Sequence, residues 1–186
     1  QRMKISLKNG PQKDVQTGQT AAAALAALGI PLGSDILAAK VNGMVVDLSR
    51  PLSEDATIEP LRFDSLEGRE VYRHSSTHLM AQAVKELFPT AQLTIGPALE
   101  DSFYYDFAYE RPFTPEDLEK IEARARDIAA RKLTITRREF SKQEALTFFT
   151  ARGEQYKVEL IEGFADGESI SAYTQGDFVD LCRGPH

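Results

Sequence analysis

Histidine and cysteine occur in two matched pairs along the chain. His74 and His78 are four residues apart, and Cys182 and His186 repeat this interval near the end of the sequence. These are all the histidines and the only cysteine among 186 residues. Side chains four residues apart on a helix project from the same face about one turn apart. Because scattered residues would rarely pair in this way, we predict that the four meet in one cleft, although an isolated histidine pair could equally be a surface or core feature.

Two chemistries suit these four side chains. Three imidazoles and a thiolate can hold tetrahedral zinc, which would be structural or would activate a water if one protein ligand were absent. Without a metal, the same groups can orient water, transfer protons and bind a polar substrate, because histidine titrates near neutral pH. The spacing does not separate these alternatives.

The composition is that of a soluble globular protein. It combines 22 Lys and Arg with 28 Asp and Glu, a net charge of −6, and 42% hydrophobic residues. A single cysteine excludes a disulfide-stapled secreted fold and favours a reducing compartment, so we expect a cytoplasmic protein. We expect no membrane span and no signal peptide, because the longest small-apolar run, Ala21 to Leu28, is far shorter than the ~18 residues a spanning helix needs.

The distribution of charge predicts two domains. Residues 1–62 hold seven basic and six acidic side chains, whereas residues 63–186 hold fifteen and twenty-two. The change falls beside the Asp64 to Gly68 segment, so we predict one domain over residues 1–63 and another over 64–186. No internal repeat is visible, and both parts should be folded.

The first part has the pattern of a small β-grasp, ubiquitin-like domain. Two hairpins, a helix and a final strand are expected from alternating residues, Asn-Gly and Gly-Pro turns and threonine caps. The expected segments are Lys4–Leu7, Lys13–Gln16, Ala21–Leu28, Ile36–Val41, Met44–Leu48 and Thr57–Phe63. This part has no histidine or cysteine, so a plain adaptor is its simplest interpretation.

The second part mixes helices and strands irregularly, which predicts an α+β fold. Helices are expected over Arg69–Phe88, after a cap at Thr114, and after a capping box at Ser141. Strands are expected from β-branched and aromatic residues in Ser102–Ala108, Leu133–Phe140, Lys157–Ile161 and Ser169–Cys182.

Five motifs resemble the N-terminal region of bacterial threonyl-tRNA synthetases. They are His74-Ser75-Ser76-Thr77-His78, Ile95-Gly96-Pro97, Phe103-Tyr104-Tyr105-Asp106, Arg152-Gly153-Glu154-Gln155-Tyr156-Lys157 and Asp180-Leu181-Cys182-Arg183-Gly184-Pro185-His186. Residues 3–62 look like the TGS domain of that family and 64–186 like its editing domain. The editing domain of alanyl-tRNA synthetases is a weaker relative, which shares the paired histidines and the Cys-x-x-x-His spacing but lacks the front domain.

The resemblance implies a hydrolytic proofreading activity. Serine lacks one methyl of threonine, and a methyl discriminates by only ~1 to 3 kcal/mol, so a second site must remove mischarged serine. The implied reaction is hydrolysis of seryl-tRNA(Thr) to serine and free tRNA(Thr), with the aminoacylation core of the parent synthetase as a further partner. The ATP-dependent ligase core is not expected within these residues, and the editing domain is expected to be truncated at its C-terminal end.

The family's editing residues carry over to seven positions of this sequence. His74 would activate water or contact the ribose, Lys157 would stabilise negative charge or hold a water, and Asp180 would receive the serine ammonium or orient a histidine. Cys182 and His186 would shape the amino-acid pocket, with a covalent role for the thiol as the lesser alternative. The full set is His74, Lys157, Cys182 and His186 as catalytic residues, and His78, Tyr105 and Asp180 as substrate-binding residues.

The metal requirement differs between the two related families. The resemblance to the threonyl enzymes favours hydrolysis without a cofactor, and the alternative is zinc at His74, His78, Cys182 and His186.

Each carried-over residue also has a plainer explanation. Lys157 alternates with apolar residues and could lie on the solvent face of a strand. Tyr105 belongs to an aromatic run that is often core, and Asp180 could be a turn or cap residue.

A basic stretch predicts the tRNA contact. It places six cations within fifteen residues, with Asp127 as the only acid there, which is enough for several salt-sensitive phosphate contacts. A solvated helix face is the alternative. The residues are Arg124, Arg126, Arg131, Lys132, Arg137 and Arg138.

Two other functions stay open on the sequence alone. The chain could be a non-catalytic tRNA-docking module, or a structural domain held together by zinc.

Overall fold

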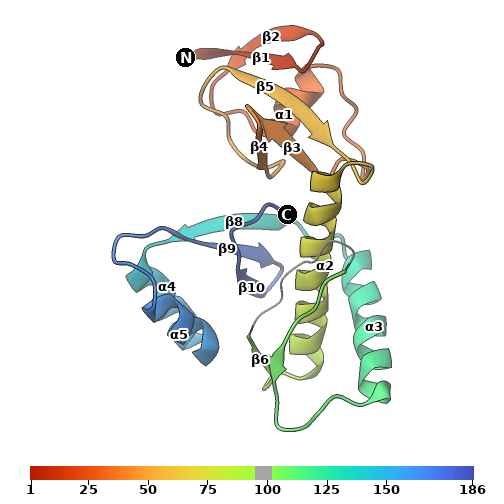
Figure 1. Ribbon diagram of the computed structural model, residues 1–186, viewed down its shortest axis with the longest axis vertical. Coiled ribbons are helices and arrows are strands. Elements are labelled where there is room, and N and C mark those ends of the chain that lie inside the picture. The colour runs from red at the N-terminus through yellow and green to blue at the C-terminus, as the bar shows by residue number, and fades with distance from the viewer. Residues whose placement is uncertain (95–101) are drawn as a thin grey trace. The chain divides into compact units, whose positions relative to one another are not determined.

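The structure is a computed structural model that describes residues 1–94 and 102–186 (Figure 1). The chain divides into two compact units, residues 1–74 with 184–186, and residues 75–183. The predicted boundary after residue 63 falls just before helix α2 (Leu66–Leu87), the first part of which belongs to the first unit. The division into domains 1–63 and 64–186 stays a prediction. The Ile95-Gly96-Pro97 motif lies outside the described residues.

The first unit contains a five-stranded mixed sheet. Parallel strands β1 and β5 lie side by side within it, and antiparallel neighbours complete the order β2-β1-β5-β3-β4. The strands are β1 (Arg2–Leu7), β2 (Gln12–Gln16), β3 (Ala38–Val41), β4 (Met44–Val46) and β5 (Ala56–Leu61). All five expected strands are present, with ends that differ by a few residues.

Helix α1 (Ala21–Ala27) packs against this sheet and closes its core. Leu25 is fully buried in one apolar cluster with Ile5 of β1 and Ile58 of β5. The Thr20 hydroxyl accepts a hydrogen bond from the amide of Ala23, as the predicted cap requires. A mixed sheet with one helix against it is the arrangement expected of a β-grasp.

The β3–β4 turn shows why its sequence is Asn-Gly. Asn42 and Gly43 have φ values of 49° and 83°, both in the left-handed region. A two-residue hairpin of type I′ needs positive φ at both positions, which asparagine and glycine tolerate best. The hairpin predicted here is confirmed.

The second unit contributes the rest of α2 and three further helices. They are α3 (Pro115–Ala130), α4 (Lys142–Ala151) and α5 (Gln155–Glu162). At the start of α3, Thr114 accepts from the amide of Asp117, and the Asp117 carboxylate accepts from the amide of Thr114. Ser141 caps α4 through the amide of Glu144. Both helix starts therefore form where the capping residues predict them.

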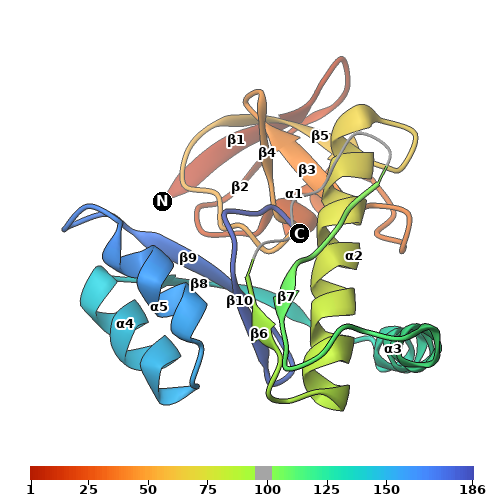
Figure 2. The same ribbon diagram turned by 60° about the horizontal axis from the view of Figure 1, so that its bottom comes forward.

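Two antiparallel sheets complete the second unit (Figure 2). The larger has the order β10-β9-β8 and the smaller pairs β6 with β7. Phe149 of α4 and Ile161 of α5 pack with Ala172 of β9 in a shared core. The strands are β6 (Gln92–Leu93), β7 (Phe107–Ala108), β8 (Ile135–Phe140), β9 (Ile170–Gln175) and β10 (Phe178–Leu181).

The strand predicted over Lys157–Ile161 is wrong, because these residues belong to helix α5. Lys157 and Ile161 are both buried, and their four-residue interval places them on one helical face. The alternation of Val158 and Leu160 with polar residues imitated a strand. The solvent-facing strand position considered for Lys157 is wrong for the same reason, since this side chain is only 4% exposed.

The strand predicted over Ser102–Ala108 is correct only at its end. β7 contains Phe107 and Ala108, which pair with the two-residue strand β6. Because β6 is so short, its ladder with β7 does not include Tyr105, and the Tyr105 side chain bonds to Asp180 instead.

No helix within the described ranges is both long and apolar enough to cross a membrane.

Candidate active site

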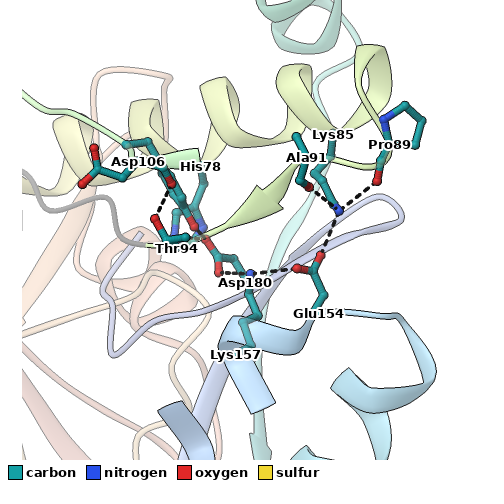
Figure 3. A network of polar contacts seen from close by, with 10 residues as sticks. His78, Lys85, Pro89, Ala91, Thr94, Asp106, Glu154, Lys157 and Asp180 are labelled. Carbon is teal, nitrogen blue, oxygen red and sulfur yellow. Dashed lines mark hydrogen bonds and ion pairs between the residues drawn. The ribbon is translucent and has the colours of Figure 1, made fainter. Parts of the chain in front are cut away.

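A buried carboxylate, Asp180, lies at the centre of a polar group in the second unit (Figure 3). Asp180 is on β10, paired in register with Tyr173 of β9, and is 4% exposed. Its Oδ2 accepts a 2.7 Å hydrogen bond from the Tyr105 hydroxyl, and its Oδ1 lies 3.1 Å from Nζ of Lys157. Nε2 of His78 lies 3.7 Å from Oδ2. The structure thus brings four predicted site residues together from α2, α5, β10 and the segment before β7.

Aromatic packing fixes the ring groups around Asp180. The ring of Tyr105 stacks on Phe107 with centroids 4.9 Å apart, and both pack in a cluster with Phe178. Phe178 in turn meets His78 edge to face at 6.1 Å. Apolar walls therefore limit how far the phenol and the imidazole can turn away from the carboxylate.

The environment keeps Tyr105 protonated. Burial raises the pKa of its phenol far above the ordinary value, and the negative charge of Asp180 and the hydrogen bond to it raise it further. Tyr105 is therefore a fixed hydrogen-bond donor at neutral pH and cannot act as a base there.

Two further charged residues, Glu154 and Lys85, continue the group away from Asp180 (Figure 3). Oε2 of Glu154 lies 3.6 Å from Nζ of Lys157, and its Oε1 lies 3.4 Å from Nζ of Lys85. Lys85 also donates to the carbonyls of Pro89 and Ala91 at 3.1 and 2.8 Å. Sequence reasoning did not single out either residue as a site residue, although Glu154 lies within one of the quoted motifs. A Glu placed three residues before Lys157 at a helix start was the available signal.

The four charged groups alternate in sign, which compensates the burial of the three that are enclosed, Glu154, Lys157 and Asp180. Lys85, Glu154, Lys157 and Asp180 form three successive opposite-charge contacts with formal charges that cancel. A buried ion is costly unless an opposite charge compensates it. Nζ of Lys157 makes its two contacts as ion pairs without hydrogen-bond geometry to any described residue.

The first unit contains the other two histidines, His74 and His186. The rings of His74 and His186 lie 4.7 Å apart between centroids, tilted by 31°. The backbone N–H of His186 donates a 2.6 Å hydrogen bond to the carboxylate of Asp47, which ties the chain end to the first unit. Cys182 belongs to the second unit. Its backbone N–H donates a hydrogen bond to the carbonyl of Ser171, and its own carbonyl accepts one from the Ser171 hydroxyl. Convergence of all three imidazoles with the thiol stays a prediction.

The side chains present fit zinc chemically. His74, Cys182 and His186 offer imidazole nitrogens and a thiolate, the donors that zinc prefers. His78 instead lies beside Asp180, a position that suits either a metal ligand oriented by a carboxylate or a proton carrier. The metal-free prediction and its zinc alternative therefore both stay open.

The basic stretch carries more compensating charge than its sequence indicates. Arg126 pairs with Glu122 at 2.8 Å, and Arg131 pairs with Glu86 at 2.8 Å. Arg138 instead lies over the Phe140 ring, 4.4 Å from its centroid. Arg124 and Arg137 also have acidic partners, Glu86 and Glu139, and Lys132 follows α3 in the left-handed region. The RNA-binding role of these residues stays a prediction.

The similar proteins and the matching domain family agree with each other. Residues 3–59 match the family described as "TGS domain". The chain is 53% identical over 98% of its length to the threonine–tRNA ligase of Symbiobacterium thermophilum, and 51% and 48% identical over the same share to those of Pelobacter propionicus and Coxiella burnetii. The predicted resemblance to threonyl-tRNA synthetases is confirmed. The chain spans 28% of the length of each of these relatives.

The match to a TGS domain also confirms the fold class. The first unit is the β-grasp that precedes a larger α+β unit, as the order of strands and helices predicted.

Proposed function

We propose that this chain is the editing part of a threonine–tRNA ligase and hydrolyses the ester of seryl-tRNA(Thr). The similarity to the ligases supports the family, and the group around Asp180 supports the hydrolytic role. The observation that carries the proposal is the meeting of a carboxylate, a phenol, an ammonium and an imidazole in one buried place. Such groups are costly to bury together and concentrate at functional sites.

The reaction needs a water to attack the ester carbonyl carbon. As the new carbon–oxygen bond forms, the carbonyl oxygen gains negative charge, and the bond to the ribose oxygen then breaks as that oxygen takes up a proton. His74 is the proposed group that removes the proton from water or contacts the ribose. Lys157 pairs with Asp180 and Glu154 but makes no hydrogen bond of good geometry to the described residues, so its ammonium is suited to stabilise the developing charge or to hold the water.

Asp180 has a binding role in this proposal. Tyr105 and Lys157 hold its carboxylate at 2.7 and 3.1 Å, so it presents a fixed negative charge that can receive the ammonium of serine or orient His78. Cys182 and His186 would shape the pocket that excludes the extra methyl of threonine. Since a methyl contributes only ~1 to 3 kcal/mol, exclusion works through a clash or a misplaced water more than through lost affinity.

The test is a deacylation assay with seryl-tRNA(Thr) and threonyl-tRNA(Thr). We expect the intact chain to hydrolyse the seryl ester faster, and His74→Ala and Asp180→Asn to lose most of that rate while still binding tRNA. Equal hydrolysis by wild type and His74→Ala, with unchanged tRNA binding, would replace the proposal with that of a docking module.

The docking alternative draws on residues 3–59, which match a TGS domain and contain no histidine or cysteine. In either case the proposed partners are tRNA(Thr) and the aminoacylation core of the ligase, in the cytoplasm. The zinc-held alternative predicts unfolding on chelation.

A further inference from the structure

We infer that Glu154, held in place by Lys85, positions the Lys157 ammonium against Asp180. The inference rests on the proposed function for its link to catalysis, but the positioning itself is a property of the folded chain. Glu154 would be a positioning residue, since the contacts described for its carboxylate are to Lys157 and Lys85.

The Lys85 ammonium makes two hydrogen bonds to the backbone and one ion pair. Two of its contacts are the carbonyls of Pro89 and Ala91, in the turn that follows α2, and the third is Glu154. Ala91 is fully buried and its amide donates to the carbonyl of Phe88, so Lys85 is held on a packed part of the chain and can fix the position of the Glu154 carboxylate.

Glu154, held by Lys85, in turn restricts the position of the Lys157 ammonium. It is 5% exposed and directly precedes α5, so its backbone and that of Lys157 are joined by one rigid turn of helix. A long lysine side chain has four freely rotating bonds, and its ammonium in this group makes ion pairs without hydrogen-bond geometry to the described residues. Two carboxylates on opposite sides, at 3.1 and 3.6 Å, can hold such a group in one place where one carboxylate would let it swing.

A solvent-accessible hollow reaches Lys85 and Glu154. Glu154 and Lys85 line a hollow of about 350 Å³, together with Gln82, Arg152 and Phe178 among others. A small carboxylate such as formate could enter this hollow if the Glu154 side chain were removed. The structure therefore allows the missing charge to be restored without restoring the covalent link.

Kinetics on the intact chain test the inference. We expect Glu154→Gln to lower kcat for seryl-tRNA(Thr) on the order of 10- to 100-fold with little change in KM, because a displaced catalytic group costs rate more than binding. Added to Lys157→Met, the same substitution should change kcat less than about twofold, since a residue that acts through Lys157 has no effect once the lysine is gone. Formate should restore part of kcat to Glu154→Ala and none to Lys157→Met. The matched control is Glu159→Gln, an exposed acid on the same helix, which should match wild type.

Nuclear magnetic resonance of the ¹⁵N-labelled lysine ammonium groups gives a readout independent of activity. An ordered Lys157 signal in wild type that broadens or disappears in Glu154→Gln, but not in Glu159→Gln, supports the inference even if the chain proves inactive and the proposed function fails. An active wild type with unchanged kcat in Glu154→Gln, a Lys157 signal that the substitution leaves unmoved, or no ordered signal at all would overturn the inference alone.

Discussion

The hydroxyl of Tyr105 donates a 2.7 Å hydrogen bond to the carboxylate of Asp180, 75 residues further along the chain. One partner comes from the segment before β7 and the other from β10. The bond therefore fixes the carboxylate with respect to a stretch of chain that carries little regular structure of its own.

Replacement of Tyr105 by phenylalanine should weaken this arrangement without disturbing the ring. The stacking on Phe107 is retained, while one bond to a charged acceptor is lost, which costs about 1.5 to 3 kcal/mol of unfolding free energy. We expect urea unfolding to show this loss and the deacylation rate to fall. Tyr104→Phe, at a position that is 45% exposed, is the control and should change neither quantity. A Tyr105→Phe variant as stable as wild type would contradict the role given to the hydrogen bond.

Lys157→Met should be strongly destabilising. The substitution leaves Asp180 and Glu154 buried without their shared cation, and breaking one partner of a buried ion pair typically costs about 3 to 5 kcal/mol. Combining it with Asp180→Asn should recover part of this loss, because one uncompensated charge is then removed. Urea unfolding of wild type, Lys157→Met and the double variant measures the effect, and a loss below about 0.5 kcal/mol in Lys157→Met would show that Lys157 is not held between the carboxylates in solution.

The start of α3 predicts an acid-sensitive contribution to stability. Hydrogen bonds from the Arg111 guanidinium and then from the Thr114 amide hold the pKa of Asp117 well below its ordinary value. Since the pKa is lower in the folded state, the contribution is complete above the unfolded pKa of about 3.9 and is lost as the pH falls through the folded pKa. The urea midpoint of wild type should therefore drop more between pH 6 and pH 3 than that of Asp117→Asn. Glu116→Gln, in the same turn, should keep the wild-type dependence.

Replacement of Arg137 and Arg138 by glutamine should weaken tRNA binding and its dependence on salt. Each lost phosphate contact lowers the slope of log affinity against log salt by about one. Lys120→Gln, an exposed position on α3 outside the predicted patch, should leave both quantities unchanged. If the double variant binds tRNA with wild-type affinity and slope, the patch is a solvated surface.

Chelation tests the metal-free prediction. We expect deacylation to persist after treatment with a chelator, and the protein to carry well under one equivalent of zinc. Near-stoichiometric zinc, with activity lost on chelation and regained on zinc addition, would instead assign His74, His78, Cys182 and His186 to a metal site. Unfolding on chelation, followed by circular dichroism, would favour the structural zinc alternative.

Local patterns were sufficient for most of the fold. Threonine and serine caps, the Asn42-Gly43 turn and the alternating strands of residues 1–62 predicted elements that the structure confirms. These features depend on neighbouring residues, so a short stretch of sequence contains the physics that produces them.

Local patterns misled where burial comes from distant parts of the chain. The residues around Lys157 alternate like a strand, yet they form α5, because Lys157 and Ile161 gain their partners from Asp180 and the α4 and β9 core. Asp180 lies on β10, well beyond α5 in the sequence, and the core around Ile161 combines residues from the elements on both sides of α5. Tertiary packing therefore decides that this segment is helical, and the local sequence pattern does not show that packing.

The candidate site also has a part that the sequence predicted and a part that only the structure revealed. Residue types and spacing alone selected His74, His78, Cys182 and His186, and the family resemblance added Tyr105, Lys157 and Asp180. Only the folded chain revealed that Asp180 is the centre and that Glu154 and Lys85 extend the charged group behind it. The physical reason is that a charge can be buried only beside its opposite, and which opposite charge it meets depends on how α2, α5 and β10 pack.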